Sequence, residues 1–170
     1  NKANACDCYI TPDSTYTLAM QPNDDGSSAL IPIPFTFNLY GQAYNSIYIN
    51  NNGNITFTGP LSTFSATAFP SVGNAIVAPF WADVDTRNGN GQVLYKIPPT
   101  AVYVNWVEVG YYAFHGDKLN TFQLIITNGS DPVIDGGNVA FCYQNMDWTT
   151  GDASQGINGF YGVPATCGAN

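Results

Sequence analysis

The sequence predicts an all-β protein, an antiparallel β-sandwich of about ten short strands with little or no helix. Its apolar residues fall in short runs rich in Val, Ile and aromatic side chains. Asn, Asp, Gly and Pro separate these runs at close intervals, and almost no stretch has the 3.6-residue apolar period of a helix. Hydrophobic residues make up 45% of the 170 residues, which suits one packed domain. We expect a Cys-bearing N-terminal tail or arm over residues 1–19 and one sandwich domain over residues 20–170.

The N-terminal half contains short strands and one strong hairpin signal. Strands at residues 46–50 and 54–58 are joined by Asn51-Asn52-Gly53, a sequence that favours a tight turn. Pro32 and Pro34 restrict the start of the strand that contains them to a sheet edge, because proline has no N–H to donate to a neighbouring strand. The other elements expected here are strands at residues 16–20 and 31–40 and a helical turn at residues 62–68.

The chain is organised around the apolar run AIVAPFW at residues 75–81, which predicts a buried strand that enters a polar turn. Pro79 lies inside this run, so we expect a bulge or the end of the strand there. The sequence AVYVNWVEV at residues 101–109 alternates, and places Trp106 on one face and Asn105 on the other. The remaining elements are a loop at residues 115–117 and strands at residues 93–97, 121–127, 138–144 and 157–163.

The charge of the chain excludes several classes of partner. The net charge is −8, and the four basic residues are Lys2, Arg87, Lys96 and Lys118. Binding to a nucleic-acid backbone or to an anionic membrane needs clusters of Lys and Arg, which this chain lacks. No apolar run reaches the roughly 20 residues of a membrane-spanning helix. We therefore expect neither nucleic-acid binding nor a membrane span.

Four cysteines, Cys6, Cys8, Cys142 and Cys167, indicate disulfide bonds and an oxidising compartment. Zinc is the competing interpretation, but Cys6-Asp7-Cys8 is too tight for the usual ligand spacing, and His115 is far from any partner motif. Three pairings are open. A bridge within Cys6-Asp7-Cys8 would be strained, so we expect Cys142 to pair with one of the others.

Six motifs follow one another in the chain: NDDGSS at residues 23–28, YINNNG at 48–53, VAPFWADV at 77–84, NWVEV at 105–109, NTFQ at 120–123 and DWTTG at 147–151. Together they resemble a NIDO domain, the extracellular module of nidogen and α-tectorin, and are most similar to the tectorin-like branch. The resemblance covers residues 20–162. It implies an extracellular, non-catalytic domain of matrix, adhesion and mucin-type proteins, and it carries over no ligand-contact residues.

The turn after the central strand carries weak candidates for a calcium site: Asp83, Asp85, Asn88 and Asn90. Ca²⁺ binds six to eight oxygen atoms, which carboxylates and amides provide. However, Arg87 stands where an EF-hand-like loop needs an oxygen, and the late Glu is missing. The alternative is that these carboxylates accept hydrogen bonds from the backbone and from Arg87. Asp24-Asp25 is a lesser candidate, with a solvated turn as its alternative, and no other cofactor is expected.

Two kinds of contact with sugars are considered. Trp148 follows Asp147 and is expected to be partly exposed, so it is the candidate for stacking on a bound sugar, whereas Trp81 and Trp106 are expected in the core. Asn54-Ile55-Thr56 and Asn128-Gly129-Ser130 match the N-glycosylation pattern, with ordinary turn asparagines as the alternative.

The predicted function is that of a secreted structural or adhesive module that acts through protein–protein contacts. Enzymatic activity is not expected, because Glu108 is the single Glu, and His115 is the single His and has no nucleophile motif beside it. A charged fraction of 9% leaves few charges to protect sheet edges. Strand or arm exchange with other copies or other extracellular proteins is therefore expected, giving an extracellular filament or matrix. Carbohydrate binding is the alternative function.

Overall fold

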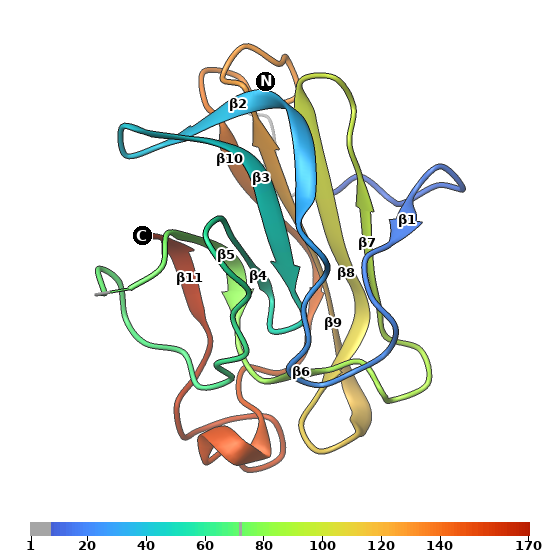
Figure 1. Ribbon diagram of the computed structural model, residues 1–170. Helices are drawn as coiled ribbons and strands as arrows, with labels where there is room; N and C mark the ends of the chain where they lie inside the picture. The colour runs from blue at the N-terminus through green and yellow to red at the C-terminus, as the bar shows by residue number, and fades with distance from the viewer. Residues whose placement is uncertain (1–7, 72) are drawn as a thin grey trace, which may run out of the picture.

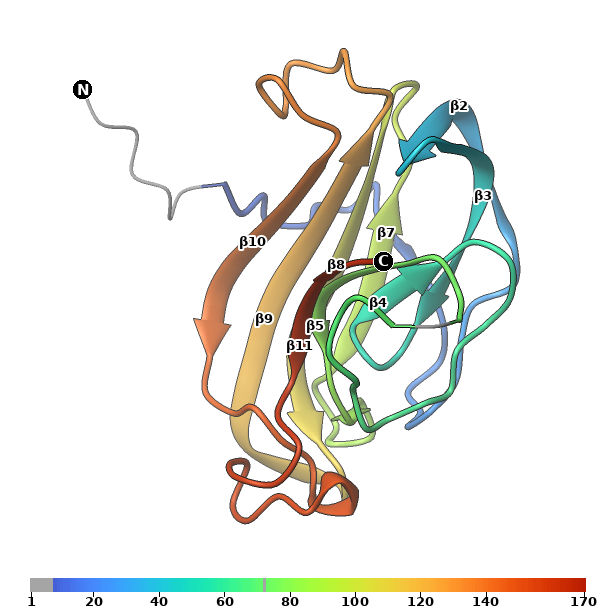
Figure 2. The same ribbon diagram turned by 90° about the vertical axis from the view of Figure 1, so that its left-hand side faces the viewer.

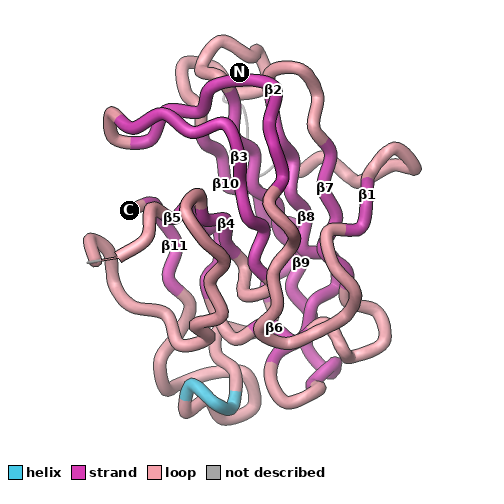
Figure 3. Tube along the Cα trace, viewed as in Figure 1, coloured by secondary structure: helices cyan, strands magenta, loops and turns pink. Residues whose placement is uncertain are grey.

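The computed structural model describes residues 8–71 and 73–170, and this part of the chain forms two antiparallel β-sheets that face each other (Figure 1, Figure 2). Within the described residues, the only helical segment is one short 3₁₀ turn, η1 (Asp152–Ser154) (Figure 3). The predicted all-β sandwich is confirmed.

The first sheet has six strands. Its order is β1 (Thr17–Leu18), β7 (Gln92–Lys96), β8 (Ala101–Tyr111), β9 (His115–Thr127) and β10 (Val139–Met146), and β6 (Val84–Asp85) also pairs with β8. The second sheet has the order β11 (Thr166–Ala169), β5 (Ile76–Trp81), β4 (Asn54–Thr56), β3 (Gln42–Asn50) and β2 (Ile31–Leu39). In the described chain β10 is therefore an edge of the larger sheet, and β2 and β11 are the edges of the smaller one.

Aromatic and branched side chains from both sheets fill the space between them. Trp106 of β8 stacks on Phe122 of β9, with ring centroids 5.1 Å apart. Phe80 of β5 meets Trp148 edge to face at 5.2 Å. Trp106 points into the core and Asn105 points to the opposite face of the sheet, as the alternation predicts.

Two local predictions about the smaller sheet are confirmed. The Asn51-Asn52-Gly53 sequence joins β3 to β4, with Asn50 paired to Asn54. Pro79 lies at a bulge, because the pairing of β5 with β11 shifts between Trp81 and Ala78. The missing N–H of Pro79 therefore interrupts no regular ladder.

Three local predictions about secondary structure are wrong. Residues 62–68 form no helical turn, and residues 115–117 are the start of the long strand β9 instead of a loop. Residues 157–163 contain only an isolated bridge between Ile157 and Phe160, and the last strand is β11 instead. β11 has the sequence TCGA, which has little strand character, and it becomes a strand by pairing with β5.

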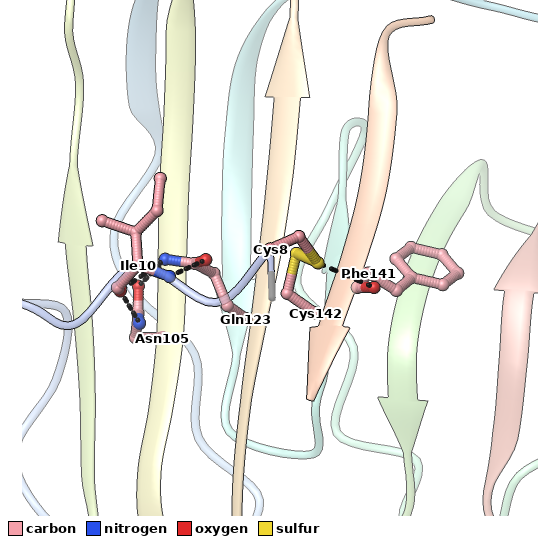
Figure 4. The surroundings of a disulfide bond; sticks show 6 residues. All are labelled: Cys8, Ile10, Asn105, Gln123, Phe141 and Cys142. Carbon is pink, nitrogen blue, oxygen red and sulfur yellow. Dashed lines mark hydrogen bonds between the residues drawn. A yellow bond between two sulfur atoms is a disulfide. The ribbon is translucent and has the colours of Figure 1, made fainter. Parts of the chain in front are cut away.

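The N-terminal segment crosses the outer face of the larger sheet (Figure 4). A disulfide joins Cys8 to Cys142 on β10. Two residues later, the Ile10 N–H donates to Gln123 Oε1 of β9, and Asn105 Nδ2 of β8 donates to the Ile10 carbonyl, at 3.0 and 3.2 Å. The segment then joins the sheet as β1, beside β7. Residues 8–18 thus span the sheet from β10 to β7.

Candidate functional site

A buried turn rich in asparagine lies at one end of the sandwich, where β3 meets β4 and β6 passes beside it (Figure 1). Asn50, Asn51, Asn52 and Asn54 are all at most 1% exposed. Gly53 ends the turn with a φ of 77°, and a Cβ there would lie 1.8 Å from the Phe80 carbonyl oxygen. Only glycine fits this position, because the backbone of β5 runs directly against it.

The amide groups of this turn hold two distant segments together. Asn51 Nδ2 donates to the carbonyl oxygens of Asp24 and Val84, at 2.5 and 2.6 Å. Asn52 Nδ2 donates to Asp25 Oδ1 at 2.8 Å, and Asn52 Oδ1 accepts from the Val84 N–H at 2.9 Å. The loop at residues 23–28 and the segment at residues 83–86 are therefore fixed beside each other by buried hydrogen bonds.

Three carboxylates meet where these segments touch. Oxygens of Asp24, Asp25 and Asp83 all lie within 4.8 Å of one another. Asp83 is 2% exposed, and its Oδ2 has no hydrogen-bond partner within the described chain; Oδ1 of Asp24 is likewise buried and unpaired. The three side chains line a depression of about 200 Å³, together with Phe64, Tyr112 and Ala153.

Proximity and burial change the acidity of this group. The pKa of Asp83 is raised to about 7, mainly by burial and then by the nearby charges of Asp24 and Asp25. The pKa of Asp24 is raised to about 6, mainly by burial and then by the charges of Asp25 and Asp85, whereas Arg87 acts in the opposite direction. A proton or another cation placed between the carboxylates stabilises a cluster of this kind, because it offsets their repulsion.

Asp85 has a different environment. Burial works against its ionisation, but hydrogen bonds from Arg87 and from the Phe114 N–H outweigh burial, so its pKa is lowered. Arg87 Nε and Nη2 donate to the two carboxylate oxygens at 2.8 and 2.6 Å. Both oxygens of Asp85 are thus occupied, which matches the alternative to calcium binding considered for this residue.

The calcium candidates of the sequence are therefore separated. Asn88 Oδ1 accepts the backbone N–H groups of Asn90 and Gly91, at 3.1 and 2.7 Å, and so stabilises its own loop. Among the described residues, the one carboxylate cluster with metal-ligand spacing joins Asp83 to Asp24 and Asp25. The sequence marked Asp24-Asp25 and Asp83 separately, and no local pattern in it indicated that they meet in the fold.

The candidates for sugar contacts lie in different surroundings. Trp148 is 1% exposed and its Nε1 donates to the Val109 carbonyl at 3.1 Å, so the expectation of an exposed indole is wrong and no ring face is open to a sugar. Asn54 is fully buried, and its Oδ1 accepts a hydrogen bond from Asn50. A glycan on Asn54 would be incompatible with this packing, because it needs an exposed side chain. Asn128 is exposed in the loop after β9 and remains a candidate.

Three of the four cysteines, Cys8, Cys142 and Cys167, lie in the part of the chain that the structure describes. The Cys8–Cys142 bond is one of the pairings that the sequence left open. Cys167 is bonded to no described residue and lies beside Tyr143 of β10. Cys6 lies outside the described residues.

These features define a class of protein: a β-sandwich domain whose N-terminal segment is fastened to the larger sheet by a disulfide, with a buried polar junction at one end. The comparison with protein families is more specific. The chain belongs to the NIDO-related family, whose model matches residues 4–168. NIDO domains of matrix proteins are non-catalytic modules.

Individual relatives support the same assignment. Human alpha-tectorin is 34% identical over 86% of this chain, which corresponds to 8% of the tectorin. The nidogen of Drosophila melanogaster is 22% identical over 81% of the chain and 12% of its own length. Dendrite extension defective protein 1 of Caenorhabditis elegans is 27% identical over 81% of the chain and 14% of its own length. The chain thus spans a small part of each relative, and no solved structure matches it.

Homology to tectorin and nidogen, together with the disulfide, indicates an extracellular location. In the part of the chain that the structure describes, no helix is long and apolar enough to cross a membrane.

Proposed function

We propose that this domain is a secreted structural or adhesive module that acts without catalysis, through contacts with copies of itself or with other extracellular proteins. The observation that carries the proposal is the edge strand β10. Its eight residues, VAFCYQNM, include no charged side chain, and among the described residues no strand pairs with its outer edge. An edge of this length without charge or proline is a template for another strand.

The other sheet edges are protected in different ways. β2 contains Pro32 and Pro34, and β11 has only four residues. β7 lies partly beside the short strand β1, and its Lys96 forms an ion pair with Asp13 at 3.6 Å. The contrast makes β10 the preferred edge for strand addition, in which backbone hydrogen bonds supply the affinity.

The form of exchange follows from where the N-terminal segment lies. Because residues 8–18 already cross the chain's own sheet, we favour addition of a partner strand to β10 over donation of this segment to a neighbour. A contact between β10 of one copy and a different surface of the next would be heterologous, and such contacts build open filaments or matrices. Carbohydrate binding loses its candidate platform with the burial of Trp148.

The proposal is tested by placing charge on this edge. Gln144 and Met146 are exposed at the end of β10. The Gln144→Lys/Met146→Lys variant should keep the wild-type fold and lose concentration-dependent association in analytical ultracentrifugation, because lysines oppose edge-to-edge pairing. The control Asp135→Lys changes an exposed loop residue and shifts the net charge equally, so it should associate as the wild type does. A wild-type domain that stays monomeric and captures no tectorin-like or nidogen-like matrix protein contradicts the proposal, as does equal association of all three proteins.

A further inference from the structure

Asp24, Asp25 and Asp83 come from two segments about 60 residues apart. Without a cation, burial and mutual repulsion of their charges destabilise the folded state. The basic side chain that contacts this region is Arg87, which forms ion pairs with Asp85 and Asp24. Arg87 directs its two donor groups at Asp85 and reaches Asp24 only at 3.3 Å. The guanidinium of Arg87 therefore pairs mainly with Asp85, and it forms no ion pair with Asp83.

An independent observation points to a ligand. Asp83 is 98% buried, yet its Oδ2 has no hydrogen-bond partner among the described residues, and Oδ1 of Asp24 is in the same condition. Buried polar atoms in folded proteins are almost always paired, so such an atom calls for a partner from outside the chain. The partner must be positive or a strong donor, because a carboxylate oxygen only accepts.

The spacing selects the kind of cation. Ca²⁺ binds oxygens at about 2.3–2.6 Å, so oxygens that share one ion lie up to about 5 Å apart. Oxygens of all three carboxylates satisfy this limit. Mg²⁺ binds at about 2.0–2.1 Å and requires a stricter octahedron, which three side chains from two loops suit less well. The depression of about 200 Å³ leaves room for the waters that would complete the coordination.

We propose that Asp24, Asp25 and Asp83 bind one Ca²⁺ ion, which joins the loop at residues 23–28 to the end of β5. The ion occupies the depression between these side chains and supplies the partner that Asp83 Oδ2 lacks. Asn51 and Asn52 position the two segments by their hydrogen bonds and do not themselves bind the ion. The site is independent of the edge strand β10, so it stands or fails separately from the proposed assembly.

The experiment uses the oxidised domain, freed of metal with EDTA and titrated with CaCl₂, MgCl₂ or TbCl₃. Ca²⁺ should raise the melting temperature more than Mg²⁺ at equal concentration. Tb³⁺ should give luminescence sensitised by Tyr112, which lines the site. Asp83→Asn should weaken Tb³⁺ and Ca²⁺ binding by more than about 100-fold, since removal of even an indirect partner of a metal site costs 10- to 100-fold.

Two further measurements separate loss of calcium binding from loss of folding. In EDTA, Asp83→Asn should melt at or above the wild-type temperature, because the amide removes charge repulsion while keeping the shape of the side chain. The control Asp135→Asn removes an exposed carboxylate elsewhere and should bind Ca²⁺ as the wild type does. No calcium-dependent shift in the wild type, a shift that survives Asp83→Asn, or equal effects of Ca²⁺ and Mg²⁺ would each overturn the proposal.

Discussion

The disulfide between Cys8 and Cys142 allows a quantitative prediction about stability. It joins residues separated by 134 positions, so it closes a loop that contains most of the domain. In the chain-entropy model, a crosslink over a loop of this length restricts the unfolded chain by about 5 kcal/mol. In the native state, hydrogen bonds between Ile10 and Gln123 also hold the N-terminal segment on the sheet, independently of the disulfide.

The prediction is tested with the Cys8→Ala/Cys142→Ala variant, whose free energy of unfolding is measured in urea by circular dichroism. We expect the free energy of unfolding to fall by about 3–5 kcal/mol, the upper figure being the entropic value above. Dithiothreitol should lower the stability of the wild type by a similar amount. Cys167→Ala is the matched control, and should change stability by less than about 0.5 kcal/mol because the residue is exposed.

A loss below about 1 kcal/mol would refute this reasoning, because a bond that restricts so long a loop cannot be nearly neutral unless the unfolded chain is already compact. The urea m-value distinguishes an unfolded chain that the disulfide constrains from one that is compact without it. A more expanded unfolded state in the variant raises m, whereas an unchanged m with unchanged stability would mean that the bond does not constrain the chain.

Three other predictions concern the polar junction and the exposed loop. Asn51→Ala should destabilise the domain by about 2–4 kcal/mol in urea unfolding, because it leaves the buried carbonyl of Val84 and the partly buried carbonyl of Asp24 without their donor; a loss under about 1 kcal/mol would contradict the role given to this turn. In EDTA, the folded state holds a proton on Asp83 up to about pH 7, whereas the unfolded chain releases it near pH 4, so stability should fall as the pH rises from 5 to 7.5. Urea unfolding at both pH values checks the sign, and a pH dependence that Asp83→Asn leaves intact would assign the effect to other groups. Expressed through a eukaryotic secretory pathway, the domain should lose its glycan mass with Asn128→Gln, and peptide mapping should find Asn54 unmodified in the folded protein.

The sequence was sufficient for features that depend on local pattern. The alternation around Trp106, the Asn51-Asn52-Gly53 turn and the bulge at Pro79 each follow from the chemistry of a few neighbouring residues. The β-sandwich follows from many such short signals taken together. The chain's place in the NIDO-related family follows from the order of its motifs.

The features that sequence reasoning missed depend on partners distant in the chain. β11 is a strand because β5 lies beside it, and Trp148 is buried because Phe80 and Tyr111 pack on it, although its polar sequence neighbours suggested exposure. The junction of Asp24 and Asp83 requires the fold to bring two segments together, and local periodicity contains no such information. Asp85 was grouped with Asp83 because both lie in the turn after the central strand, but the hydrogen bonds from Arg87 to Asp85 give the two residues different roles.

The crossing of the N-terminal segment over the larger sheet has a mechanical consequence. If tension is applied between the two ends of this domain, the covalent bond at Cys8 passes the load directly to Cys142 on β10. Residues 9–141, which include the acidic cluster and most of both sheets, then lie outside the path of the force. Only the chain from β10 to the C-terminus can be drawn out, on the order of 100 Å when fully extended, against roughly 550 Å for the unbridged polypeptide. A fibre that contained this module would lengthen by a short step, at the cost of removing Trp148 from the core and β11 from the smaller sheet, while residues 9–141 carry no load.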